Sequence, residues 1–194
     1  CLFCSRKQVG NVTGDCMNIK HFFYSLARNV VFSPIPITTV LARYILKKTG
    51  LFSFKHRLYF DAVTDPKYAY GIYWSAVQAK RVGLTKITVL EFGVAGGRGL
   101  RSMEQITKEI EKELSITIDI YGFDNGTGYP KTFDPRDMGY FFPEGVLHFD
   151  KKETEESLTK ARVIWGPVEK TVKNFIKNFE PAPIAFIAMD LSGF

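Results

Sequence analysis

The sequence predicts an α/β domain built on an open, doubly wound, mostly parallel sheet. Two observations lead to this prediction. From residue 66 to the end of the 194-residue chain, short apolar runs alternate with segments of helical periodicity, as parallel strands joined by right-handed crossovers require. In addition, polar and glycine-rich clusters at 91–99, 122–128 and 190 each follow an apolar run. Ligands bind at the carboxyl ends of strands in such sheets.

The first helix and strand are predicted from spacing. Residues 66–82 show helical periodicity and end at Gly83, with these side chains on or near one face: Tyr70, Trp74, Val77 and Val82. Residues 86–92 form an apolar run typical of a strand buried on both faces.

The next two elements follow the same alternation. Residues 98–114 predict an amphipathic helix with charged residues outside and this inward stripe: Leu100, Met103, Ile106, Ile110 and Leu114. Residues 115–123 predict a second strand, which runs into the turn residues FDNGTGYP.

The last part of the chain completes the pattern. Residues 130–160 are rich in loops and then acidic and helical. Strands are predicted at 162–165 and 184–189, the latter ending at Asp190. Between them lies a helix at 168–179 with the following side chains inward: Val172, Phe175 and Ile176.

Residues 1–65 differ from this domain and are predicted to form a basic helical and irregular arm. Residues 1–60 carry nine Lys and Arg against one acid, a net charge of +8, and the remaining 17 bases and 19 acids give −2. Such an arm suits packing on its own domain or on a partner subunit of a homo-oligomer. Its basic, aromatic-rich composition also suits contact with an anionic membrane surface.

Composition narrows the protein class further. No apolar stretch reaches the roughly 18–20 residues that a membrane span needs. The main domain has no cysteines and hence no disulfide pattern, which favours a cytoplasmic location. A nucleic acid partner is not expected, because the main domain is slightly acidic.

The stretch VLEFGVAGGRGL predicts a strand entering a helix through a glycine turn that binds a cofactor. The pattern of a phosphate-binding loop is absent because no lysine follows the glycines. A dinucleotide pattern fits poorly, because Ala95 places a methyl group where a pyrophosphate needs bare backbone. Glu91, two positions before Gly93, suits the ammonium of S-adenosylmethionine, and Asp124 after the second strand suits ribose hydroxyls.

Several motifs together resemble class I S-adenosylmethionine-dependent methyltransferases, closest to a bacterial group related to the macrocin-type O-methyltransferases. The resemblance covers 66–194 and rests on YAYGIYWSAVQAKRVGL, VLEFGVAGGRGL, YGFDNGTGYP, VIWGPVEKTVKNFI and PIAFIAMDLS. It implies a Rossmann-like fold and O-methylation of a small-molecule acceptor. Since that fold has seven strands in the order 3-2-1-4-5-7-6, we expect the chain to be a fragment, truncated at both ends.

The resemblance also implies roles for individual residues. Residues of the first turn would line the methionine side of the cofactor, namely Glu91, Phe92, Gly93, Ala95 and Gly97. Ser102 would lie near the carboxylate of the methionine part. Asp124 would bind the ribose, and the adenine would lie against three consecutive residues: Gly166, Pro167 and Val168.

Two positions depart from the family pattern. Pro167 replaces an acid that contacts adenine, and the second acid expected shortly after Asp190 is absent. Asp190 is therefore a candidate general base, or a ligand of Mg²⁺ in an incomplete site. An NAD-dependent oxidoreductase and a non-catalytic Rossmann-like interaction domain stay open as alternatives.

Overall fold

The computed structural model describes residues 37–129, 131, 143–146 and 149–191. The chain divides into two compact units, residues 1–42 and 43–194. Of the first unit, the described part is the start of helix α2 (Ile37–Thr49). Most of the predicted basic arm, including its three cysteines, lies outside the described residues, and the boundary expected at residue 65 stays a prediction.

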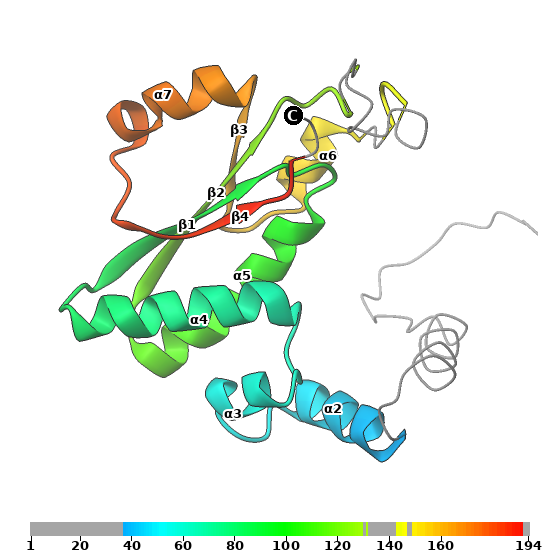
Figure 1. Ribbon diagram of the computed structural model, residues 1–194, viewed down its shortest axis with the longest axis vertical. Helices are drawn as coiled ribbons and strands as arrows, with labels where there is room; N and C mark the ends of the chain where they lie inside the picture. Colours follow the sequence, from blue (N-terminus) through cyan, green and yellow to red (C-terminus); the bar gives the residue numbers. More distant parts are fainter. Residues whose placement is uncertain (1–36, 130, 132–142, 147–148, 192–194) are drawn as a thin grey trace, which may run out of the picture. The chain divides into compact units, whose positions relative to one another are not determined.

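The second unit is built on a parallel sheet of four strands in the order β3-β2-β1-β4 (Figure 1). The strands are β1 (Lys86–Phe92), β2 (Thr117–Asp124), β3 (Arg162–Trp165) and β4 (Ile184–Met189). This confirms the Rossmann-like α/β prediction and the expected order of the first four strands. Strand β2 begins two residues later than predicted, because Ser115 ends the preceding helix in a left-handed conformation.

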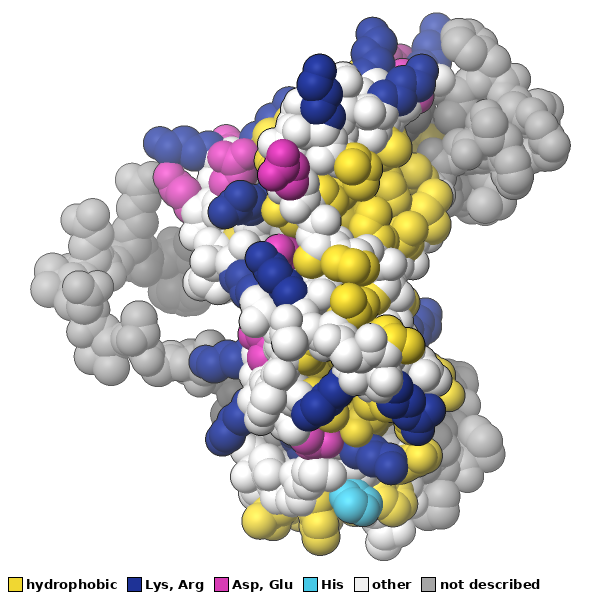
Figure 2. Space-filling model, turned by 90° about the vertical axis from the view of Figure 1, so that its left-hand side faces the viewer, with side chains coloured by type: hydrophobic (Ala, Val, Ile, Leu, Met, Phe, Trp, Pro, Cys, Tyr) yellow, Lys and Arg dark blue, Asp and Glu magenta, His cyan; other side chains and the backbone are white. Residues whose placement is uncertain are grey.

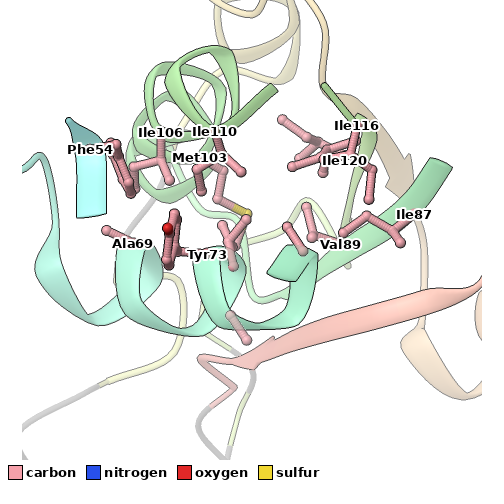
Figure 3. Packing of buried hydrophobic residues seen from close by; sticks show 14 of the residues in the cluster. Phe54, Ala69, Tyr73, Ile87, Val89, Met103, Ile106, Ile110, Ile116 and Ile120 are labelled. Atoms are coloured by element: carbon pink, nitrogen blue, oxygen red, sulfur yellow. The ribbon is translucent and has the colours of Figure 1, made fainter. Parts of the chain in front are cut away.

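Helices α4 (Pro66–Arg81) and α5 (Arg98–Leu114) cover one face of the sheet (Figure 1). The two-residue pleat of β1 turns Ile87 and Val89 toward these helices, where they join the main hydrophobic core (Figure 3). The short helix α3 (Phe54–Tyr59) adds Phe54 and Leu58 to the same core. Arg57 of α3 also pairs with Glu109 of α5, so this helix is tied to the domain by charge as well as packing.

The buried face of α4 matches the sequence prediction only in part. Trp74 and Val77 are partly buried against the main core as expected, whereas Tyr70 and Val82 are exposed. The fully buried side chains of the helix are Ala69, Ile72, Tyr73, Ala76 and Ala79. Three of these five are alanines, which allow the helix backbone to approach the sheet and α5 closely. The stripe predicted on α5 is confirmed, with Leu114 only partly buried.

Helix α7 (Val168–Phe179) covers the other face of the sheet and completes an α/β/α sandwich (Figure 1). Phe175 lies in a cluster of rings, 5.0 Å from Tyr121 and 5.2 Å from Phe123 between centroids. The other two side chains predicted to point inward, Val172 and Ile176, are exposed. That prediction was wrong for Val172 and Ile176, because the rings of Phe175 and Phe179 make the contact with Tyr121 of β2.

Strand β4 forms an edge of the sheet within the described residues. Ile184, Ile187 and Met189 are exposed along it, as expected for an uncovered apolar strand. Val172, Ile176 and Phe179 of α7 are also exposed. Figure 2 shows hydrophobic side chains gathered in the upper half of one face of the molecule. Among the described residues, no helix is long and apolar enough to cross a membrane.

Replacing Phe175 with alanine should lower the free energy of unfolding by about 3–5 kcal/mol, as is usual for a buried ring. The matched control is Ile176→Ala on the same helix, where the side chain is exposed and the expected loss is below about 1 kcal/mol. Urea denaturation followed by circular dichroism measures both. Equal losses for the two variants would contradict the assigned packing of α7.

Candidate functional site

The three polar clusters predicted from the sequence meet at one edge of the sheet. They follow β1, β2 and β4, whose carboxyl ends lie side by side because the strands are parallel. The Asp190 N–H donates to Phe92 O at 2.8 Å, and the Gly93 N–H donates to Phe123 O at 2.9 Å. Strand β2 follows β1 in the chain and lies on one side of it in the sheet, whereas β4 lies on the other side of β1. The strand order therefore reverses between β1 and β4, which is where open α/β sheets bind ligands.

The turn after β1 needs its glycines. Gly93 has φ of +88°, and a Cβ there would overlap the carbonyl of Asp190, which follows the neighbouring strand β4. Gly97, with φ of +75°, begins helix α5 and provides no side-chain cap. Ala95 has φ of +46°, a conformation that costs a non-glycine residue on the order of 1 kcal/mol. The turn is thus strained, and it leads into a helix whose first N–H groups have no capping side chain at the N-cap position.

Asp124 holds this turn in place. Its Oδ2 accepts hydrogen bonds from Val94 N at 2.8 Å and Ala95 N at 3.0 Å. Its Oδ1 accepts from Gly126 N at 2.7 Å in its own turn. The residue predicted to bind ribose therefore bridges the turns after β1 and β2.

The segment predicted to lie against adenine is next to Asp124. Gly166 N donates to the Asp124 carbonyl at 2.8 Å, and Pro167 precedes the first turn of α7 without a side-chain cap. Val168 packs against the aromatic cluster beneath the turn. Phe92 belongs to that cluster, stacked on Phe123 at 4.9 Å. Ser102 lies one turn into α5 and is half-buried.

Arg101 is a site residue that the sequence did not indicate. Its Nη1 donates to the Gly96 carbonyl at 2.9 Å and to Ser157 Oγ at 2.8 Å, so it ties the glycine turn to the end of α6 (Lys151–Glu156). Its partner Ser157 is 56 positions away, a separation at which no local pattern predicts contact. Phe149 and Trp165 also stack beside this turn, with centroids 5.8 Å apart.

Glu91 is placed differently from a ligand-contacting side chain. The pleat of β1 points it to the same face as Val89, beneath α4 and α5, where it is only 1% exposed. Tyr68 of α4 donates a hydrogen bond from its hydroxyl to Oε1 at 2.6 Å. A Cβ on Gly99 would overlap this carboxyl group, so glycine at the start of α5 leaves room for it. Oε2 is buried and has no hydrogen-bond partner among the described residues.

Burial raises the pKa of Glu91 to about 7, and the nearby acids Asp190 and Asp65 act in the same direction. The hydrogen bond from Tyr68 and the charge of Arg98 oppose this shift. Burial and the bond to Glu91 also raise the pKa of Tyr68, which therefore keeps its proton at neutral pH. The site contains a carboxyl group close to half-ionised under physiological conditions.

Asp190 is exposed directly after β4, at the point where the strand order reverses. Its carboxylate is therefore accessible to a ligand, in contrast to that of Glu91. The described residues contain no group of three or more His, Cys, Asp or Glu side chains that could hold a metal ion. Asp190 alone provides too few oxygen ligands for Mg²⁺.

Comparison with known proteins supports the fold. No family model and no curated protein sequence matches the chain significantly. Among solved structures, the calicheamicin methyltransferase CalS11 is similar, with a TM-score of 0.51 and 20% identity over 96% of this chain and 74% of that one. An apo structure of CalS11, described as a TDP-rhamnose 3'-O-methyltransferase, gives a TM-score of 0.40 and 22% identity over 92% and 69%. The chain thus shares the Rossmann-like α/β fold of the first of these structures.

The Glu91→Gln variant should be more stable than the wild type at pH 8, by roughly 2–3 kcal/mol. The pKa of Glu91 is higher in the folded state than the 4.5 of the free side chain, so the folded protein binds more protons between these values. Wild-type stability contributed by this group is therefore complete below pH 4.5 and is lost as pH rises through about 7. Thermal unfolding from pH 4.5 to 8 measures the difference.

The matched control is Glu156→Gln, at an exposed position of α6 that pairs with Lys152 on the surface. This variant should follow the wild type at every pH. A Glu91→Gln advantage that stays constant across the pH range would show that Glu91 is not the titrating group.

Proposed function

We propose that the chain is an S-adenosylmethionine-dependent methyltransferase that transfers a methyl group to an oxygen atom of a small molecule. The observation that carries this proposal is the meeting of Asp124 with the strained glycine turn at the reversal point of the sheet. An acid at the end of β2 beside a bare turn after β1 suits a nucleoside with an amino-acid tail. The similarity of fold to a methyltransferase supports the same conclusion.

The residues present fit this cofactor. Gly93 and Gly97 let the backbone of the turn approach the Asp190 carbonyl and Thr154 closely. The start of α5 suits the carboxylate of the methionine part. Asp124 would hold one ribose hydroxyl, since a carboxylate has about four acceptor sites and three of them already accept backbone N–H groups here. Gly166, Pro167 and Val168 would flank the adenine through backbone and apolar contacts.

The cofactor supplies a methyl group that is activated by its bond to a positively charged sulfur. The protein's task is then to align the acceptor and to remove one proton. Asp190 is the exposed carboxylate at the reversal point, and we assign it as the base that takes the proton of the acceptor hydroxyl. The acceptor oxygen would then bond to the methyl carbon while the carbon–sulfur bond electrons stay with the departing thioether. No step through a divalent metal is proposed, because the ligand set for one is not found among the described residues.

The proposal predicts that the protein binds S-adenosylhomocysteine and that Asp124→Asn weakens this binding at least about tenfold. The substitution removes the charge that the turn N–H groups and the ribose hydroxyl share, and hydrogen bonds to charged groups contribute about 1.5–3 kcal/mol. Isothermal titration calorimetry with S-adenosylhomocysteine and with NAD measures both affinities.

The matched control is Asp119→Asn, which lies on the same strand but pairs with Lys86 at the opposite end of the sheet. This variant should bind as the wild type does. Tight binding of NAD without S-adenosylhomocysteine would favour an oxidoreductase. Binding of neither ligand would favour a non-catalytic interaction domain.

A further inference from the structure

Glu91 presents a problem that its sequence position does not reveal. An acid two positions before the first glycine of the turn suits a cationic ligand group, yet the side chain is 1% exposed. The carboxyl group is enclosed by Tyr68 and by Gly99 at the start of α5. A ligand in the site therefore cannot contact Glu91 directly, and any effect of its charge must pass through a neighbouring group.

Tyr68 is the neighbour that can transmit this charge. Its hydroxyl proton is committed to Glu91 Oε1 at 2.6 Å, so its oxygen can only accept further hydrogen bonds. The ring is half-buried and packs edge-on against Phe186 of β4, with centroids 6.4 Å apart. Since α4 starts at Pro66, this side chain lies in the first turn of the helix, at the carboxyl ends of β1 and β4.

The charges around Tyr68 favour a cation. Glu91, Asp190 and Asp65 all act electrostatically on the Tyr68 hydroxyl. Arg98 of α5 acts on Glu91 with the opposite charge. Oε2 of Glu91 has no hydrogen-bond partner among the described residues. A hydroxyl oxygen backed by a buried carboxylate and flanked by two more acids is a strong acceptor for an ammonium group.

We propose that the Tyr68 hydroxyl oxygen binds the ammonium group of the cofactor's amino-acid part, and that Glu91 acts behind it as a positioning residue. The inference rests on the proposed function, because it concerns the same cofactor. It adds Tyr68 as a binding residue and replaces direct contact of Glu91 by an indirect role. Glu91 fixes the direction of the Tyr68 hydroxyl and increases the negative charge on its oxygen.

The proposal makes ligand affinity depend on pH. Protonation of Glu91, whose pKa is about 7, removes the charge behind Tyr68 and should weaken binding of the ammonium group. The groups that act on Glu91 from the surrounding elements are Tyr68 and Asp65 from the side of α4, Asp190 after β4, and Arg98 of α5. An amino group stays largely protonated between pH 5.5 and 7.5, so the ligand itself contributes little to the change.

The test compares Tyr68→Phe with Tyr70→Phe, the same substitution at an exposed position of the same helix. Calorimetry at pH 7.5 uses two probes, S-adenosylhomocysteine and 5′-methylthioadenosine, which lacks the amino-acid part. Tyr68→Phe should weaken S-adenosylhomocysteine about tenfold or more and 5′-methylthioadenosine less than about twofold. Tyr70→Phe should change neither affinity.

Each outcome decides the matter. An equal loss for both probes in Tyr68→Phe would assign Tyr68 to the structure of the site and overturn the inference, as would no loss for either probe. A wild-type protein that binds neither probe would overturn the proposed function itself, and the inference with it.

A second arm tests the role of Glu91. Wild-type affinity for S-adenosylhomocysteine should fall about tenfold from pH 7.5 to 5.5, whereas Glu91→Gln should bind weakly and almost independently of pH. A purely structural role of Glu91 would not produce this difference in pH profile. The same fall in the variant would show that another group titrates and would overturn the positioning role.

Discussion

The Asp124 carboxylate is the interaction on which the candidate site depends. It accepts N–H groups from the turn after β1 and from the turn after β2, so one anion joins two loops from different strands. These N–H groups lie outside the sheet ladder, and without the carboxylate they would lose their partners. The glycine turn before α5 is arranged around this side chain, and the Gly166 N–H donates to the backbone carbonyl of the same residue.

The alternation of β1 imposes the second constraint. The pleat that buries Ile87 and Val89 also buries Glu91, because side chains two apart share a face. An acid in the core is costly unless it is paired or neutral, and Tyr68 provides a partner for only one of its oxygens. The site is therefore polarised, with a buried half-ionised acid on the side of α4 and hydrogen-bonded Asp124 on the side of β2.

The packing of the helices extends this arrangement to the rest of the domain. Alanines on α4 bring that helix close to the sheet, and this closeness allows Tyr68 to reach β1. Glycine at position 99 similarly leaves space for the Glu91 carboxyl at the start of α5. On the other face, helix α7 is held against β2 by the rings of Phe175 and Phe179. Small side chains on one face of the sheet and aromatic rings on the other thus position the site.

The sequence by itself determined the strand positions, the helix spans and the cluster formed by the turn, Asp124 and Asp190. These follow from local periodicity and from the geometry of parallel crossovers. The strand order was expected only from the family resemblance. Tertiary structure alone decided which side chains of α4 are fully buried, that Arg101 holds the turn, and that Glu91 reaches the site only through Tyr68. Contacts between side chains 23 or 56 positions apart depend on how elements pack, and no local pattern encodes them.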